Sequence, residues 1–371
     1  MKKIILLLVL ASSPAFAGKL LFDARLDGQG QTFNNEASSA TLGHDNFRFM
    51  MKTARLDYQG NLNDKTNVRA RAILNTTQGA VQTRDNLNGT VDLFFVNHKV
   101  QDNLELTAGK FSSDIGGWEH QLSSPDVYLF SAAYSGGSSD LNTTTRTLFA
   151  GRTGATIGTF TWASTGTTRY YTGAKLTHKV EGHELAIHTA DLTADDNVGT
   201  TSSQTRTLTG LVYKGSFSDK LIQPLLSYHE GFLPGGGSDA KVIFANAGLR
   251  FNFDDNVIDL DYLTNTFKSR TAVSTGGFKD DAIRSTLLAW SKVYGQWTPK
   301  VKLESSEMLA ADQKIFDVKG YSVALEYRPE VEENFRYHVA YNAKEYAPIT
   351  GSSLTMQEVV VGTRIAADIL K

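Results

Sequence analysis

The chain has 371 residues, with 37 basic and 39 acidic side chains and no cysteine. The absence of cysteine excludes a disulfide-stapled secreted fold and cysteine-ligated metal sites. The charge is nearly balanced and no basic run occurs, so no nucleic acid partner is expected. Beyond the first residues no apolar stretch approaches the length of a transmembrane helix, which excludes an α-helical membrane protein.

The N-terminus has the features of a secretory signal peptide in the usual order. Lys2 and Lys3 precede an apolar run over residues 4–10, and Ala15 and Ala17 supply the small residues that a signal peptidase requires. The apolar run is too short to span a bilayer as a helix. The sequence therefore predicts a signal peptide over residues 1–17 and a mature chain over residues 18–371.

Apolar and polar residues alternate at period two in segment after segment of the mature chain. In residues 67–75, Val68 and Ala70 alternate with Arg69 and Arg71. The same pattern recurs over residues 320–328, 334–346 and 358–365. Such alternation is typical of strands with one apolar and one polar face.

The connections between these strands alternate between tight and long. Tight polar turns are predicted near residues 61–66, 101–103, 181–183, 218–220, 254–256, 298–300 and 329–333. Longer segments rich in Gly, Ser and Thr cover about residues 30–45, 79–88, 113–143, 196–203, 232–239, 269–280, 311–318 and 346–353. Short turns at one end of the strands and long loops at the other are the layout of a transmembrane barrel.

The strand segments favour a membrane barrel over a soluble β domain. They run to about nine to thirteen residues, enough to cross a bilayer when tilted, whereas strands of soluble proteins average about five or six. Aromatic residues near strand ends, such as Phe47, Phe49, Tyr321 and Tyr327, are placed for interfacial girdles. We therefore predict an all-β, transmembrane antiparallel β-barrel in the bacterial outer membrane, with short periplasmic turns and longer extracellular loops.

The predicted number of strands is even and lies between sixteen and eighteen. Eighteen is the preferred count, and a sixteen-strand interpretation merges a weak pair around residues 156–158.

Three stretches resemble a known family. Residues 106–111 (LTAGKF) resemble the strand that precedes the long third loop of the phosphate-selective porin O and P type. Residues 321–329 (YSVALEYRP) and 334–341 (NFRYHVAY) resemble the late hairpin of that family. The resemblance in layout covers the whole mature chain.

The resemblance implies a water-filled barrel that passes small hydrophilic solutes and ions passively. It also implies a third loop, here about residues 112–143, folded inward as a constriction, and a homotrimer embedded in outer-membrane lipid. Two features depart from the family. The chain ends in Lys371 without the terminal aromatic residue that many such porins carry, and the run of inward arginines is only partly visible. Phosphate selectivity therefore does not follow.

The candidate functional residues are charged side chains of the lumen and of the loop, because such charges set which ions pass a pore. They are Arg55, Arg69, Arg71, Arg250, Arg284 and Arg336 on the wall, and Asp114 and Glu119 on the loop. Arg69 and Arg71 share one face of one strand, and Arg55 lies across a turn from them, which predicts a basic cluster near the constriction. The alternative is that these charges only solvate the lumen and pair with one another.

An enzyme, a cofactor and a metal centre are not expected. Residues 183–188 (HELAIH) are one residue too long for the zinc signature, and no Gly-x-Ser-x-Gly elbow occurs. The acidic turns at residues 195–197 and 254–256 favour turn formation and leave calcium binding open. A barrel-embedded hydrolase built from spatially close Ser and His residues stays open, as does a non-conducting adhesin or structural barrel. The large third loop favours a pore, since only a pore needs its lumen narrowed partway.

Overall fold

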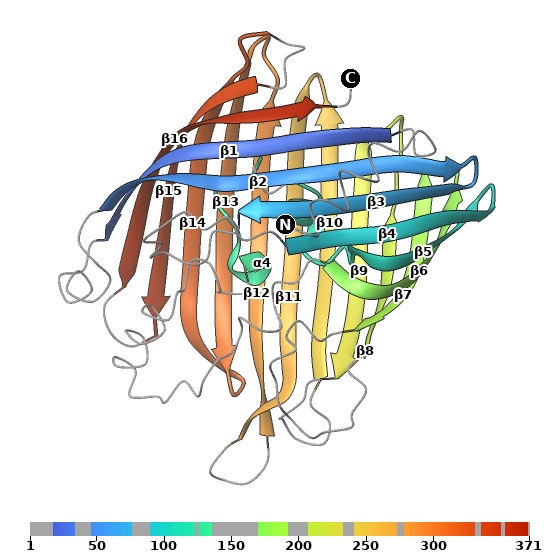
Figure 1. Ribbon diagram of the computed structural model, residues 1–371. Helices are drawn as coiled ribbons and strands as arrows, with labels where there is room; N and C mark the ends of the chain where they lie inside the picture. The colour runs from blue at the N-terminus through green and yellow to red at the C-terminus, as the bar shows by residue number, and fades with distance from the viewer. Residues whose placement is uncertain are drawn as a thin grey trace.

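The chain forms a single closed, antiparallel β-barrel of sixteen strands (Figure 1). The computed structural model describes residues 18–33, 46–75, 90–122, 126–135, 170–191, 207–232, 241–272, 278–330, 335–349 and 353–369. The strands are β1 (Gly18–Phe33), β2 (Asn46–Asn63), β3 (Thr66–Asn75), β4 (Thr90–Gln101), β5 (Leu104–Ser112), β6 (Tyr170–Val180), β7 (His183–Asp191), β8 (Thr207–Lys214), β9 (Ile222–Phe232), β10 (Lys241–Phe253), β11 (Asn256–Ala272), β12 (Phe278–Lys292), β13 (Trp297–Ala310), β14 (Gln313–Tyr327), β15 (Phe335–Pro348) and β16 (Leu354–Asp368).

Each strand pairs with its neighbours in the sequence, and β1 pairs with β16 to close the barrel. Leu21 lies opposite Asp368 and Arg25 lies opposite Arg364 in this closing pair. Closure leaves no strand edge unpaired, which is the condition for a sheet to cross a bilayer.

Two short helices, α3 (Gly117–Gln121) and α4 (Ala132–Ser135), lie between β5 and β6 in the chain. No helix within the described ranges is long and apolar enough to cross a membrane.

The strands have an apolar outer face and a largely polar inner face. In β16, Val359, Val361 and Ile365 are exposed on the outer face, whereas Glu358 and Arg364 point inward to polar partners. Exposed large apolar side chains along a closed barrel are the surface that lipid covers. The period-two alternation thus places the apolar face outward, as predicted.

The inner wall also carries an apolar area. Leu208, Phe244, Ile283 and Phe316 are buried in one cluster with Ala132 of α4. The barrel interior is therefore not uniformly polar. Where inner and outer side chains are both apolar, as in parts of β8 to β14, the alternation of apolar and polar residues in the sequence is weaker.

Sixteen strands lie at the lower end of the predicted range, so the preferred count of eighteen was two strands too many. The weak pair around residues 156–158 lies outside the described residues. Two connections also differ from the prediction. The expected long loop at 311–318 is a tight turn at Ala311 and Asp312, and the expected turn at 298–300 lies inside β13.

The tight turn between β13 and β14 forms without glycine. Ala311 and Asp312 both have positive φ angles, 50° and 62°. The N–H of Ala311 donates a hydrogen bond of 2.8 Å to Asp281 on β12, which helps to stabilise this backbone conformation. The turn before β13 instead contains Gly295, with φ 58°, and Pro299 pairs with Leu325 as a strand residue.

Candidate pore constriction

The segment that follows β5 packs against the inner wall of the barrel. We call residues 113–122 and 126–135 the inner segment; the rest of the predicted loop 112–143, apart from Ser112 at the end of β5, lies outside the described residues. The N–H groups of Trp118 and Glu119 donate to the carboxylate of Asp261 on β11, over 3.0 Å and 3.3 Å. The N–H of Ala132 donates to Glu304 on β13 over 2.6 Å. Inward carboxylates therefore bind the backbone of both short helices.

Ion pairs hold the second half of the inner segment. Asp126 lies 2.7 Å from Nη1 of Arg336 on β15 and 2.7 Å from Nη1 of Arg364 on β16. Burial alone opposes ionisation of Asp126, but the charges of Arg336 and Arg364 hold its pKa below the ordinary 3.8. Lys302 on β13 binds Glu119 and donates to the carbonyl oxygen of Leu129 over 2.7 Å.

Tyr128 lies in the middle of this charged network. The guanidinium of Arg25 on β1 lies 4.5 Å from the centre of the Tyr128 ring. The Tyr128 hydroxyl donates to Glu326 on β14 over 3.0 Å. Burial and the adjacent charge of Glu326 raise the pKa of Tyr128, so this hydroxyl stays protonated.

Asp114 fixes the start of the inner segment. Its carboxylate lies 3.0 Å from Nζ of Lys214 on β8 and 3.9 Å from Nζ of Lys175 on β6. Burial opposes ionisation, but the charges of Lys214, Lys175 and His120 hold the pKa of Asp114 well below 3.8. Asp114 is therefore an anion at any physiological pH.

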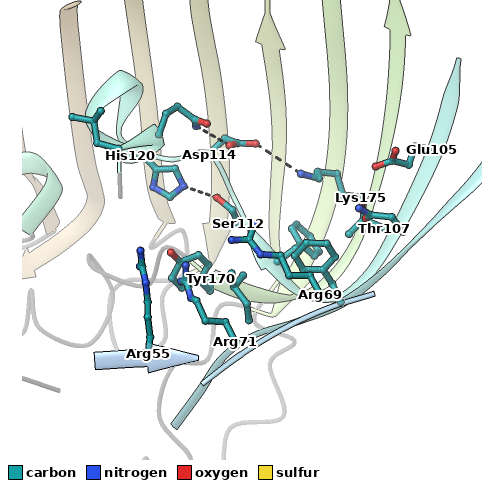
Figure 2. Close-up of a pocket in the computed structure, with 16 residues that line it drawn as sticks. Arg55, Arg69, Arg71, Glu105, Thr107, Ser112, Asp114, His120, Tyr170 and Lys175 are labelled. Atoms are coloured by element: carbon teal, nitrogen blue, oxygen red, sulfur yellow. Dashed lines mark hydrogen bonds and ion pairs between the residues drawn. The ribbon is translucent and has the colours of Figure 1, made fainter. Parts of the chain in front are cut away.

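A cavity of about 330 Å³ separates the inner segment from the wall formed by β2 to β6 (Figure 2). Figure 2 shows Arg55, Arg69 and Arg71 on the side of this wall and Asp114 and His120 on the opposite side. We call this space the basic cavity. Its lining residues are Arg55, Arg69, Arg71, Leu93, Phe95, Asn97, Glu105, Thr107, Phe111, Ser112, Asp114, His120, Gln121, Leu122, Tyr170 and Lys175.

Each arginine of the basic cavity is bound to a carboxylate. Arg55 pairs with Asp23 over 2.9 Å, Arg69 with Asp57 over 2.6 Å and Arg71 with Asp92 over 2.5 Å. These three carboxylates are not among the residues that line the cavity. The guanidinium groups therefore face the cavity, and the carboxylates that hold them in position lie behind them.

The structure brings together half of the candidate residues at the basic cavity: Arg55, Arg69, Arg71 and Asp114. Three further candidates lie elsewhere in the lumen. Arg250 pairs with Asp259 over 2.6 Å and lies 4.2 Å from the centre of the Trp118 ring. Glu119 binds Lys302, and Arg336 binds both Asp126 and Glu326.

Arg284 was wrongly predicted to face the lumen. It lies on the outer face of β12 and pairs with Glu307 over 2.8 Å, whereas its neighbours Ile283 and Ser285 are fully buried inside. The period-two alternation misplaces it because Ile283 and Leu287 are apolar residues that face inward. If the face of β12 that carries Ile283 and Leu287 is assigned to lipid, the inner and outer faces of the strand are exchanged and Arg284 is wrongly placed in the lumen.

The candidate set leaves out residues that the geometry makes equally important. Lys175 and Tyr170 line the basic cavity, and Lys302 anchors the inner segment. Alternation along β6 places Lys175 in the lumen. No local pattern in the sequence tells which lumen residues face the inner segment. Among the described residues, no group of three or more His, Asp or Glu side chains is arranged to hold a metal ion.

Comparison with solved structures gives barrels of the same kind. The outer membrane channel DcaP of Acinetobacter baumannii is 12% identical with a TM-score of 0.67, covering 96% of this chain and 99% of that chain. The anion-selective porin from Comamonas acidovorans is 11% identical with a TM-score of 0.66, covering 95% and 100%. The trimer form of OmpT from Vibrio cholerae is 11% identical with a TM-score of 0.58, covering 95% and 100%. At such identities these likenesses bear on the fold alone.

Comparison with curated protein sequences gives no match. Comparison with family profiles gives a match to the family that residues 106–111, 321–329 and 334–341 resemble. The profile "Phosphate-selective porin O and P" matches residues 25–216, just over half of the chain. The closed barrel of sixteen strands and this match lead to one conclusion: the chain belongs to the phosphate-selective porin O and P family.

Proposed function

We propose that this outer-membrane porin passes small hydrophilic solutes with a preference for anions, and that they pass between the arginine-bearing wall and the inner segment. The observation that carries the proposal is the basic cavity, in which Arg55, Arg69 and Arg71 face the inner segment across open space and Lys175 lies beside Asp114. Charged groups at the narrowest part of a pore set its ion preference.

The position of the inner segment supports an off-centre channel. Its anchoring contacts include Asp261 on β11, Glu304 on β13 and Arg364 on β16. The basic cavity lies on the other side, against β2 to β6. The inner segment thus packs along β9 to β16 and leaves the arginine wall as the boundary of the channel.

The exposure of the ion pairs supports a preference for anions. The side chain of Arg69 is 36% exposed, whereas that of its partner Asp57 is 9% exposed. Lys175 is likewise more exposed than Asp114. A solute therefore meets the cation of these two pairs before the carboxylate, whereas Arg71 and Asp92 are 8% and 12% exposed. The planar guanidinium groups also suit bidentate contact with carboxylates and phosphates, in keeping with the family's name.

Reversal potentials in planar bilayers under a salt gradient test this proposal. The wild-type pore should be anion-selective, and Arg69→Glu with Arg71→Glu should shift the reversal potential toward cation selectivity. Arg284→Glu is the matched control, because Arg284 lies on the outer face, and it should leave the reversal potential unchanged. Unaltered ion preference in the double variant would contradict the role of the arginine wall. A folded protein that never conducts would contradict the pore itself.

We propose further that the mature chain begins at Gly18 and forms a homotrimer in outer-membrane lipid. The small residues Ala15 and Ala17 after the apolar run support cleavage before Gly18, and a protein of similar fold from Vibrio cholerae forms a trimer. N-terminal sequencing of protein from outer membranes tests the cleavage. Chemical cross-linking in membranes, followed by electrophoresis without heating, tests the trimer, and bands no larger than a dimer would contradict it.

One contact favours the hydrolase alternative. Ser112 Oγ and His120 Nε2 lie 2.6 Å apart at the edge of the basic cavity, the spacing of a nucleophile and its base. Asp114, a carboxylate that lines the same cavity, accepts from Gln121 over 2.9 Å and from Lys214 over 3.0 Å. We therefore assign this contact to joining α3 to β5. Ester hydrolysis that disappears in Ser112→Ala would overturn that assignment.

A further inference from the structure

A second lumen cavity, of about 220 Å³, lies between the inner segment and strands β10 to β14. We call it the apolar cavity. Apolar side chains form much of its lining, including Val257, Leu287 and Ala289 on the wall and Leu129 on the inner segment. The basic cavity, in contrast, is lined mainly by charged and polar side chains. The two cavities therefore offer different chemistry to a solute in the same lumen.

Three cationic residues line the apolar cavity, and each is more exposed than its carboxylate partner. The side chain of Lys300 is 24% exposed and its partner Glu326 is fully buried. Arg250 and Lys302 are likewise more exposed than Asp259 and Glu119. A molecule in this cavity consequently meets both apolar surface and cationic groups.

The one carboxylate of the inner segment that is partly open to this cavity is Asp126. It lies 2.7 Å from both Arg336 and Arg364, which balance its charge. Asp261 also lines the cavity, and its carboxylate accepts the N–H groups of Trp118 and Glu119. The acidic groups are therefore occupied by partners within the protein.

We propose that the apolar cavity is a binding site for a small organic anion with a compact hydrocarbon body, such as a single-ring carboxylate. The ring would lie against Val257, Leu287 and Ala289, and the carboxylate would face Lys300 or Arg250. The volume is below the range of about 300–1,000 Å³ typical of sites for drug-sized ligands, which limits the occupant to about one ring. The proposal rests on the proposed anion preference and adds a second, chemically distinct site to the lumen.

Block of chloride current through the full-length pore in planar bilayers measures binding at this site, because an anion held there adds negative charge beside the chloride path. Benzoate and cyclohexanecarboxylate should each halve the current at a concentration at least about tenfold below that of acetate, because burial of the ring adds to the attraction of the shared carboxylate. Equal half-blocking concentrations for the three anions would overturn the proposal.

Two variants locate the site. Val257→Thr replaces a methyl group by a hydroxyl of similar shape, and Ala289→Phe fills the cavity. Each should raise the half-blocking concentration of benzoate at least about fivefold and change that of acetate less than twofold. Val323→Thr, on the outer face of β14, is the matched control and should keep wild-type block. Benzoate block that persists unchanged in either folded variant would overturn the assignment, and a variant that fails to fold leaves the other to decide.

The outcomes also separate this inference from the proposed function. A cation-selective wild-type pore would contradict the proposed function. An anion-selective pore that treats benzoate like acetate would contradict only the second site.

Discussion

The carboxylate of Asp126 accepts a hydrogen bond of 2.7 Å from Arg364, a residue 238 positions further along the chain. Arg364 also donates to Asp23 on β1 over 2.7 Å. Since β1 and β16 close the barrel, one guanidinium joins the closing strands to the inner segment. The position of the inner segment in the lumen is thereby coupled to barrel closure.

Removing the charge of Asp126 should loosen the inner segment. Asp126→Asn keeps the shape of the side chain but no longer balances Arg336 and Arg364. Because the site is partly buried, we expect a loss of about 1–3 kcal/mol of anchoring free energy. Single-channel recordings should show more open-channel current noise than the wild type. Asp317→Asn, on the outer face beside Lys314, is the control and should leave the noise unchanged. Open-channel noise equal to that of the wild type in Asp126→Asn would show that the other contacts are enough to hold the inner segment in place.

The ion pairs of Asp114 and Asp126 should persist well into acid. The pKa values of Asp114 and Asp126 lie below the ordinary 3.8, because neighbouring Lys and Arg charges outweigh the effect of burial. A carboxylate with a depressed pKa stabilises the folded state above its ordinary pKa, and that contribution is lost as the pH falls through the depressed value. The difference in open-channel current noise between the wild type and Asp126→Asn should therefore stay constant from pH 7 to about pH 4 and disappear only below it. A loss of this difference between pH 5 and pH 6 would contradict the assignment.

Neutralising a carboxylate bound to the arginine wall should increase the preference for anions. Asp57 accepts two hydrogen bonds from Arg69, of 3.0 Å and 2.6 Å. Asp57→Asn removes one negative charge and leaves a hydrogen-bond acceptor, so the field of Arg69 in the cavity becomes stronger. We expect a reversal potential further toward anion selectivity than that of the wild type. A shift toward cations would mean that Arg69 needs the carboxylate to hold its position.

The barrel could be predicted from the sequence because its two determining signals are local. Period-two alternation follows from the geometry of a strand, and strand length reflects the thickness of the bilayer. The predictions of a side-chain direction and of a turn fail where inward residues are apolar or where a turn depends on a distant residue. Ile283 and Leu287 are apolar but inward, so the alternation assigned Arg284 to the wrong face. The turn at Ala311 contains no glycine and depends on Asp281 of another strand.

The candidate site was predictable in part, for a related reason. Arg55, Arg69 and Arg71 are close in sequence on paired strands, so alternation and a turn bring them together. The contacts that place the inner segment join distant parts of the chain, such as Asp261 with Trp118 and Arg364 with Asp126. Charge alone does not indicate these partners, since the lumen offers many carboxylates and cations.

Gly117 tests whether Asp261 positions α3. It has φ +65°, and a Cβ atom there would lie 2.5 Å from Oδ1 of Asp261. Gly295 has φ +58° with open space around it, so Gly295→Ala should cost only the backbone strain of about 1–2 kcal/mol. Gly117→Ala carries the same strain and also displaces a carboxylate that accepts the N–H groups of Trp118 and Glu119. We expect about 1–3 kcal/mol more loss than in Gly295→Ala.

Urea titration of the two refolded variants, with open-channel noise as a second readout, measures this difference. The free energy of unfolding reports the global cost, and the noise reports a local loosening of α3 that leaves the barrel intact. A larger effect on either readout in Gly117→Ala than in Gly295→Ala would support the role of Asp261. Equal effects on both would mean that α3 keeps its place without this carboxylate, and that ion pairs such as Lys302 with Glu119 hold the inner segment instead.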